Sequence, residues 1–365
     1  MKFINDAGYN HAAPKKIGIL LTNLGTPDST NPSDVRRYLK EFLSDPRVVE
    51  VPRLIWWFVL NLVILNTRPR KSAAAYAKIW TAQGSPLLDI SLKQLAALQA
   101  RLDEVYPDVF QVELAMRYGN PSVASALEKL HASGADRILT LPLYPQYSAS
   151  TTASTFDAVT ARLQQWRNIP ELRFIKHYHD NEHYLNALEQ SIRAHWQQHG
   201  QAERLLMSFH GVPKDYLLNG DPYHCECHKT ARMLAEKLGL SDSQYQVSFQ
   251  SRLGPKEWLK PYTDHTLEAM GKGGVESVQV VCPGFSSDCL ETLEEIAMEN
   301  RDVFLQAGGS RYEYIPCLND NEDHINMMLE LIAHHSQGWD MLTAEQQKNL
   351  LTATKKRAID MGAEN

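Results

Sequence analysis

The sequence predicts an α/β protein built from two Rossmann-like, doubly wound halves with a cleft between them. The first observation is that short apolar runs, typical of buried strands, end in loops marked by Gly and Pro at residues 16–23 and 137–143. The second is that helical patterns alternate with such runs, at residues 88–102, 123–132, 151–166 and 184–197. The third is that this scheme occurs twice along the chain.

Two pairs of segments carry the repeat. They are residues 18–24 with 204–210, and residues 138–150 with 277–288. When Gly25 is aligned with Gly211 and Pro145 with Pro283, the two markers lie 120 residues apart in the first half and 72 in the second. The first half therefore carries about 48 extra residues. Because ligands of such sheets bind beyond the carboxyl ends of the strands, we expect an insertion beside a ligand cleft.

These markers divide the chain into three parts. We expect an N-terminal half at residues 16–157, with an apolar insertion at about 45–90, and a C-terminal half at residues 158–314 that carries the metal site. Residues 315–365 are expected to form a closing helix, at 323–334, and a polar tail. The length of 365 residues suits two domains.

The insertion contains the most apolar stretch of the chain, LIWWFVLNLVIL at residues 54–65. Its twelve residues are too few to span a bilayer, which needs about 20. The stretch is bracketed by the cations Arg53, Arg68, Arg70 and Lys71. It suits either a membrane interface or a lip beside a ligand, or else a buried helix. Adjacent Trp56 and Trp57 point in different directions on a helix, which makes it hard to bury both.

Composition narrows the class of protein. The net charge is −6 and no Lys/Arg stripe with interleaved aromatic residues occurs, so we expect no nucleic-acid partner. The first sixteen residues lack the apolar region of a signal peptide, and five cysteines follow. We therefore expect free thiols in a reducing cytoplasm.

Two segments that resemble cofactor motifs have the wrong spacing. His224-Cys225-Glu226-Cys227-His228 lacks the CxxC pairs of zinc ribbons and iron–sulfur proteins, so we expect no metal there. The glycines of residues 271–274 lack the order of nucleotide-binding loops.

The remaining candidates follow apolar strands of the second half. His210 ends the strand at residues 204–210, where an imidazole can act as a base or ligate a metal, although it could equally be a core histidine. Glu291, Glu295 and Glu299 recur every four residues along one helix face, as acids also do on solvated helices. Together, imidazole and carboxylates without a full cage suit transient binding of Fe(II).

Eight motifs, in order, resemble those of the ferrochelatase family. They are NLGTP (23–27), GSPL (84–87), AMRYGNP (115–121), LYPQYSASTT (143–152), SFHG (208–211), GDPY (220–223), FQSRLGP (249–255) and PGFSSDCLETLEEI (283–296). The resemblance covers residues 17–317 and is closest to bacterial members. It implies two Rossmann-like halves, a porphyrin site between them and no tightly bound cofactor.

The resemblance also implies roles for individual residues. His210 matches the family's catalytic histidine and Glu291 its partner carboxylate, with Asp288 in support. Metal binding falls to His210, Glu291, Glu295 and Glu299, the last two on a proposed metal or proton route. The positions that match the porphyrin site are Leu24, Arg68, Ser85, Arg117, Tyr118, Tyr147 and Phe285, with Arg68 a partner for a propionate.

Some positions depart from the pattern of relatives. Cys289 stands where some have histidine, and Leu24 where others have methionine or tyrosine. Ala149 stands where relatives with an iron–sulfur cluster have cysteine, and their C-terminal cysteine triplet is absent, so we expect no cluster.

The resemblance predicts insertion of Fe(II) into protoporphyrin IX, with release of two protons. Peripheral contact with the inner membrane face, an iron donor and neighbouring enzymes of haem biosynthesis are the further partners we expect. The alternatives are a chelatase for coproporphyrin or another tetrapyrrole, and a non-catalytic porphyrin or haem carrier. A Trp-rich lip suits a membrane-delivered protoporphyrin better than the more soluble coproporphyrin.

Overall fold

The computed structural model describes residues 3–4 and 12–363, and it contains two four-stranded parallel sheets. The first has the order β2-β1-β3-β4 and the second β6-β5-β7-β8, so the two halves have the same topology. The first sheet consists of β1 (Lys16–Thr26), β2 (Phe110–Gly119), β3 (Ala135–Pro142) and β4 (Glu171–Phe174). The second consists of β5 (Arg204–His210), β6 (Tyr245–Gln250), β7 (Ser277–Val281) and β8 (Arg311–Ile315). The predicted pair of related α/β halves is confirmed.

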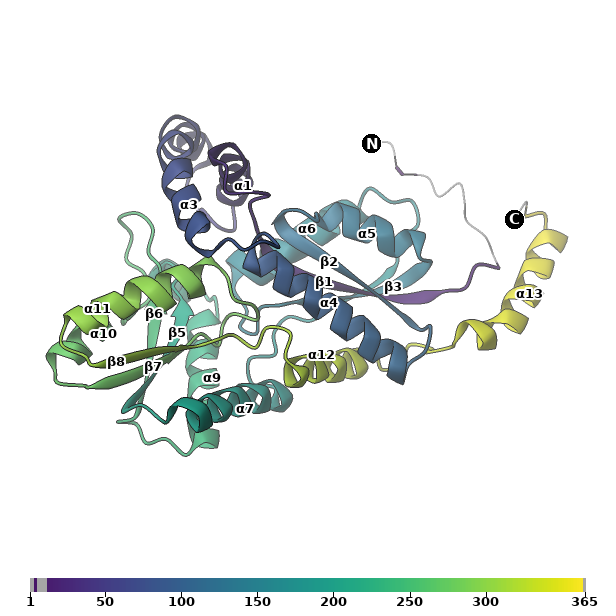
Figure 1. The fold of residues 1–365 in the computed structure, drawn as a ribbon. Helices are drawn as coiled ribbons and strands as arrows, with labels where there is room; N and C mark the ends of the chain where they lie inside the picture. Colours follow the sequence, from purple (N-terminus) through teal and green to yellow (C-terminus); the bar gives the residue numbers. More distant parts are fainter. Residues whose placement is uncertain (1–2, 5–11, 364–365) are drawn as a thin grey trace.

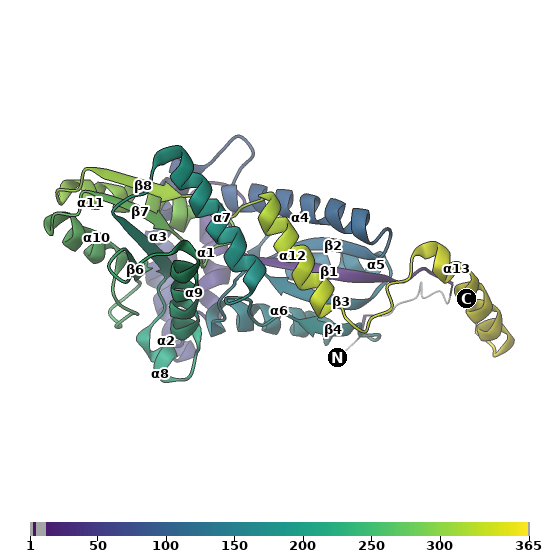
Figure 2. The same cartoon turned by 90° about the horizontal axis from the view of Figure 1, so that it is seen from below.

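Helices cover both faces of each sheet (Figures 1 and 2). The helices of the first half are α4 (Pro86–Val105), α5 (Val123–Ala132), the π-helical segment η2 (Ala149–Ala153) and α6 (Ser154–Leu163). Those of the second half are α7 (Glu182–His199), α8 (Lys214–Leu218), α9 (Tyr223–Leu238), α10 (Thr263–Lys272), the π-helical segment η3 (Glu291–Asn300) and α11 (Arg301–Gln306).

Side chains along β1 point alternately to the two faces of the sheet, so helices must pack on both faces to bury its apolar run. Ile19 and Leu21 face the core that contains α4, whereas Leu20 faces the core beneath α5 and α6. The first of these cores also contains residues of β5, such as Met207. One continuous apolar core therefore joins the two halves.

An insertion between β1 and α4 distinguishes the first half. It comprises α1 (Pro32–Ser44), α2 (Arg53–Phe58), the π-helical segment η1 (Val59–Ile64) and α3 (Leu65–Ile79). These helices have a small core of their own, and Figure 1 shows α1 and α3 standing above the two sheets. The extra residues thus occupy the helices from 32 to 79, whereas the sequence placed the insertion at about 45–90.

The division between the halves also differs from the predicted boundary at 157/158. That boundary falls inside α6, and the first sheet continues to β4, which pairs with β3. We therefore place the division after Phe174. The strand signal of β4 is weak because its four residues are only partly covered.

The C-terminal part contains α12 (Glu322–His335) and α13 (Ala344–Asp360). The first packs against α4 and α7 and so bridges the two halves, as a closing helix should. The second extends away from the body in Figure 2 and is joined to the start of β1 by hydrogen bonds between Lys15 and Gln347. The expectation for the N-terminal segment lies mostly outside the described residues. Among the residues that are described, no helix is long and apolar enough to cross a membrane.

Candidate active site

His210 is the last residue of β5, and its imidazole is held by the backbone of the next residue. Its Nδ1 lies 2.6 Å from the carbonyl oxygen of Gly211. A carbonyl only accepts hydrogen bonds, so Nδ1 carries a proton, and the tautomer that results when Nε2 is unprotonated has its lone pair on Nε2. His210 is partly exposed, so this nitrogen can accept a proton or ligate a metal.

Gly211 is required by the close approach of β6. A Cβ at this position would lie 2.9 Å from the carbonyl oxygens of both Gln250 and Ser251. The absence of a side chain lets the Gly211 amide donate to the Gln250 carbonyl at 2.6 Å. The turn that supplies the acceptor for His210 is therefore fixed by backbone packing.

The acidic row lies on η3 and not on an α-helix as the four-residue spacing suggested. Ser251 donates to Glu295 from both its amide, at 2.8 Å, and its hydroxyl. Burial raises the pKa of the Glu295 carboxyl, while the Ser251 hydrogen bonds and the nearby His210 lower it and Glu291 raises it further. Glu295 thus interacts electrostatically with both of its predicted partners, which brings His210, Glu291 and Glu295 into one site.

The row passes from partly buried positions to an exposed one. Glu291 lies beside the buried tyrosines Tyr38 and Tyr76 of the insertion, and its charge adds to the effect of burial in raising their pKa values. Glu299, in contrast, is exposed, and partial burial and Glu294 raise the pKa of its carboxyl. The described positions form a graded line of carboxylates, which is compatible with the predicted route for metal or protons.

Glu294 is a residue of η3 that the sequence analysis missed. Its buried carboxylate forms an ion pair with Lys78 of α3 at 2.5 Å. The pair connects the insertion of the first half to the acidic row of the second. No periodic signal marks it, because its partner lies 216 residues away in the sequence.

Asp288 is buried, and its described hydrogen bonds hold the loop before η3. Its carboxylate accepts from Thr292 at 3.0 Å, from Tyr314 at 2.5 Å and from the Asn319 amide at 2.7 Å. None of these partners is a predicted reacting group. The geometry suits a residue that positions the start of η3 and not one that takes a proton itself.

Arg117 and Tyr118 lie beneath the site, in a buried polar network. Arg117 donates to Ser154 at 2.7 Å and to Asp45, and the Tyr118 hydroxyl donates to Asp45 at 2.9 Å. Tyr118 is 0% exposed, so the structure does not place its ring at a surface that a porphyrin could touch. The network instead fixes the end of β2 to the insertion and to α6.

The other predicted substrate positions are closer to the surface, with one exception. Phe285 is partly exposed, and its ring centroid lies 6.4 Å from that of His210. Tyr147 is partly exposed beneath the ammonium group of Lys176, and Leu24 packs against the core of the insertion. Arg68 is exposed on α3. Ser85 is the exception, at 4% exposure.

The loops that follow the equivalent strands β3 and β7 meet each other. The Ser286 hydroxyl donates to the Leu143 carbonyl at 3.0 Å, and Gln94 of α4 donates to the Ser286 carbonyl at 3.0 Å. A Cβ on Gly284 would contact Gln146. The carboxyl ends of the central strands therefore face one another, as the predicted arrangement requires.

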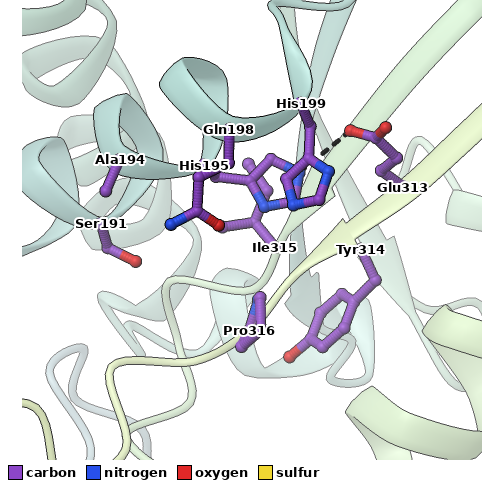
Figure 3. Close-up of a pocket in the computed structure, with 9 residues that line it drawn as sticks. All are labelled: Ser191, Ala194, His195, Gln198, His199, Glu313, Tyr314, Ile315 and Pro316. Atoms are coloured by element: carbon purple, nitrogen blue, oxygen red, sulfur yellow. Dashed lines mark hydrogen bonds and ion pairs between the residues drawn. The ribbon is translucent and has the colours of Figure 1, made fainter.

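A pocket of about 560 Å³ lies elsewhere, between α7 and the end of β8 (Figure 3). Its lining includes His195, whose Nε2 lies 3.0 Å from the Glu313 carboxylate. None of the predicted site residues lines it. The pocket is therefore not a candidate for the predicted chemistry.

Comparison with known proteins decides the family. The family model described as Ferrochelatase matches residues 16–336. The chain belongs to the ferrochelatase family. It is 54% identical over 369 residues to a ferrochelatase of Thioalkalivibrio sulfidiphilus, covering 100% of both chains. It is also 56% identical over 339 residues to a ferrochelatase of Herminiimonas arsenicoxydans, covering 93% of this chain and 92% of that one.

Solved structures show the same fold at low sequence identity. The cobalt complex of the sirohydrochlorin chelatase SirB from Bacillus subtilis subspecies spizizenii has a TM-score of 0.52 at 11% identity. The match covers 89% of this chain and 97% of that one. SirB from Bacillus subtilis with Fe³⁺ also has a TM-score of 0.52, at 13% identity, with 90% and 100% covered. The chelatase-like fold predicted from the sequence is confirmed.

Proposed function

We propose that this protein inserts Fe(II) into protoporphyrin IX to form protohaem, with release of two protons, as the last step of haem biosynthesis. Family membership over nearly the whole chain supports the reaction. The observation that carries it is that His210, whose Nε2 can present a lone pair, interacts electrostatically with Glu295, which also interacts with Glu291. Insertion needs a base for two pyrrole protons and ligands that release the metal, and this set offers both without closing a cage.

In this proposal, the roles of the imidazole and the three carboxylates follow from how far each is exposed. His210 and Glu291 receive the pyrrole protons and hold the incoming Fe(II), while Glu295 and the exposed Glu299 connect them to the surface. The raised pKa values of Glu295 and Glu299 mean that these carboxyls take up protons more readily than ordinary ones. Asp288 positions the loop before η3.

The porphyrin is proposed to lie beside Leu24, Tyr147 and Phe285, with Ser85 at its margin and Arg68 toward a propionate. Arg117 and Tyr118 act as support, because their polar groups are occupied by Asp45 and Ser154. The macrocycle then contacts apolar and aromatic groups on one side and titratable groups on the other.

The insertion supports a peripheral contact with the inner membrane face, at which a cytoplasmic enzyme would collect its porphyrin. Its exposed apolar side chains are Leu54 (73%), Ile55 (58%), Trp57 (55%), Phe58 (50%), Leu62 (63%) and Val63 (55%). Such a contiguous set on α2 and η1 suits the boundary between headgroups and acyl chains, with Arg53 and Arg70 near anionic lipid.

We further propose that the protein works without an iron–sulfur cluster or another tightly bound cofactor. Ala149 stands at the position that carries cysteine in relatives with a cluster, and burial raises the pKa of the Cys227, Cys282, Cys289 and Cys317 thiols. The purified protein should contain no labile sulfide. A cluster absorption band that bleaches on reduction would overturn this part of the proposal.

Anaerobic incubation of the full chain with Fe(II) and either protoporphyrin IX or coproporphyrin III, followed by absorption, tests the function. We expect turnover of protoporphyrin at the higher kcat/KM. Preference for coproporphyrin would make the protein the other type of chelatase. Binding of either porphyrin without turnover would make it a carrier.

A further inference from the structure

A second cluster of metal-ligating side chains lies apart from the acidic row. Within residues 3–4 and 12–363, one group of His, Cys, Asp and Glu side chains brings three ligand atoms within 4.8 Å of one another. Its members are His177 and His179, which follow β4, and Glu226 in the first turn of α9. None of them is used by the proposed mechanism. The sequence predicted no metal at the segment around Glu226, because the two cysteines beside it lack the spacing of a metal-binding pair.

The contacts within the cluster are short. His177 Nδ1 lies 2.6 Å from Glu226 Oε1, and His179 Nδ1 lies 3.4 Å from Glu226 Oε2. The two imidazole centroids are 4.9 Å apart. Ligand atoms around a tetrahedral zinc ion lie roughly 3.3 Å from one another, given bonds of about 2.0 Å. Small rotations of the side chains would therefore bring all three ligand atoms into a coordination shell.

His179 provides the independent sign of a missing ligand. Its side chain is 6% exposed, and its Nδ1 is buried without a hydrogen-bond partner. An unsatisfied buried nitrogen costs about 1–3 kcal/mol, and a protein keeps such a group rarely. A neutral imidazole at this position would present the lone pair that a metal requires.

The surroundings hold the three ligands in place. Behind His179, the Asp180 carboxylate lies 3.9 Å from Nε2 and is itself paired with Lys229. Metal-bound histidines commonly direct their second nitrogen toward such a carboxylate. Glu226 Oε2 accepts the Tyr147 amide at 2.7 Å, and a bound ion would replace the proton that Oε1 now shares with His177 Nδ1.

We propose that His177, His179 and Glu226 bind one divalent transition-metal ion of borderline character, such as Zn(II) or Co(II), at a site separate from His210. Two imidazoles and one carboxylate suit these ions, and the exposed side at His177 leaves a fourth position for water. Hard cations such as Mg(II) are disfavoured because they demand oxygen ligands. A bound ion would join three segments: the chain after β4, the start of α9 and, through the Tyr147 amide, the loop after β3.

The test measures binding of Co(II) and Zn(II) to the chelator-treated full chain, by visible absorption of Co(II) and by equilibrium dialysis. His210→Ala removes the proposed substrate site and should leave the second site intact. Glu226→Gln removes the charge but keeps an oxygen for the Tyr147 amide. His177→Ala changes an exposed residue and should not affect folding, whereas His179→Gln changes a buried one. His183→Gln is the matched control, because His183 is exposed one turn further on.

In the His210→Ala background we expect one bound ion with a tetrahedral Co(II) spectrum. Each of His177→Ala, His179→Gln and Glu226→Gln should weaken this binding at least tenfold, whereas His183→Gln should not. Zn(II) should raise the melting temperature of the His210→Ala protein, and the rise should vanish when His177→Ala is added, although the metal-free double variant still folds. Unaltered Co(II) binding in His177→Ala and Glu226→Gln would overturn the proposal. Because this measurement needs no turnover, it can succeed or fail independently of the proposed chelatase activity.

Discussion

Leu24 and His210 occupy equivalent places in the two halves, each directly before a glycine at the carboxyl end of a central strand. The loops after β3 and β7 correspond in the same way, with Tyr147 opposite Phe285 and Ser150 opposite Asp288. Both loops lead into π-helical segments, η2 and η3, a geometry that is rare and often found at functional sites.

The two halves use these equivalent places for different chemistry. The positions of η2 and α6 that match Glu291, Glu295 and Glu299 are Ala153, Asp157 and Ala161. Asp157 is occupied by an ion pair with Arg47 at 2.8 Å. The first half therefore offers apolar and aromatic side chains where the second offers an imidazole and carboxylates. Under the proposed function, one scaffold used twice would separate binding of a flat apolar substrate from handling of metal and protons.

The largest difference between the two halves should appear when the equivalent residues His210 and Leu24 are substituted. His210→Ala should lower kcat by at least about 100-fold while the fold and porphyrin binding persist, because loss of a general base or metal ligand typically costs that much. Leu24→Ala should change KM more than kcat, since it removes only apolar contact. Steady-state kinetics and porphyrin fluorescence measure both. If His210→Ala kept more than a tenth of the activity, the chemical difference between the halves would lie elsewhere.

Substitutions of the equivalent residues Asp288 and Ser150 compare the two loops by their effect on the free energy of unfolding. Asp288→Asn places an amide against the Asn319 amide and weakens the acceptor for Tyr314, so we expect a loss of about 1–3 kcal/mol in the free energy of unfolding. Ser150→Ala should change it by less than about 0.5 kcal/mol, because the Ser150 hydroxyl lies at a partly exposed position. Urea denaturation compares the two. Equal effects would show that Asp288 does not hold its loop.

Trp56 and Trp57 should separate the two interpretations of the insertion. Trp56 is partly buried and its Nε1 donates to the Leu43 carbonyl at 2.6 Å, so Trp56→Ser should cost about 1 kcal/mol or more of stability. Trp57 is exposed, so Trp57→Ser should leave the melting temperature unchanged but weaken binding to anionic vesicles in a flotation assay. High salt should reproduce only part of that loss, because it screens the cations alone. Equal flotation of both variants would contradict a membrane contact at Trp57.

The smallest expected effect concerns Glu295 and its match Asp157. A carboxyl whose pKa is raised on folding binds its proton more tightly in the folded state. Between the pKa of the unfolded state and that of the folded state, the free energy of unfolding therefore falls as the pH rises. Glu295→Gln removes this effect and should gain stability relative to the unsubstituted protein as the pH rises toward neutrality. Asp157→Asn should show no such gain. Thermal melts across the acidic to neutral range check the sign, and a gain that grows toward low pH would contradict it.

The sequence was informative where a local pattern carried the signal. The bounds of α5 and β5 were predicted as the structure has them, because apolar periodicity and flanking Gly or Pro marked both ends. The strands β2 and β6 were not singled out, although the alternation of polar and apolar residues in β2 is itself a strand signal, and β6 is short. The row Glu291, Glu295 and Glu299 was identified by spacing, yet its π-helical geometry was not, because no residue pattern distinguishes the two helix types.

What the sequence by itself determined was the repeat and the family, and it singled out the side chains proposed to react, because motifs, strand-end glycines and acidic spacing are properties of neighbouring residues. Tertiary structure alone decided which of these side chains are free to act. It buried Tyr118 against Asp45, joined Lys78 to Glu294 across the two halves, and brought His177 and His179 to Glu226. These contacts join residues between 47 and 216 positions apart, where local pattern carries no information and only the packing of the two sheets sets the distance.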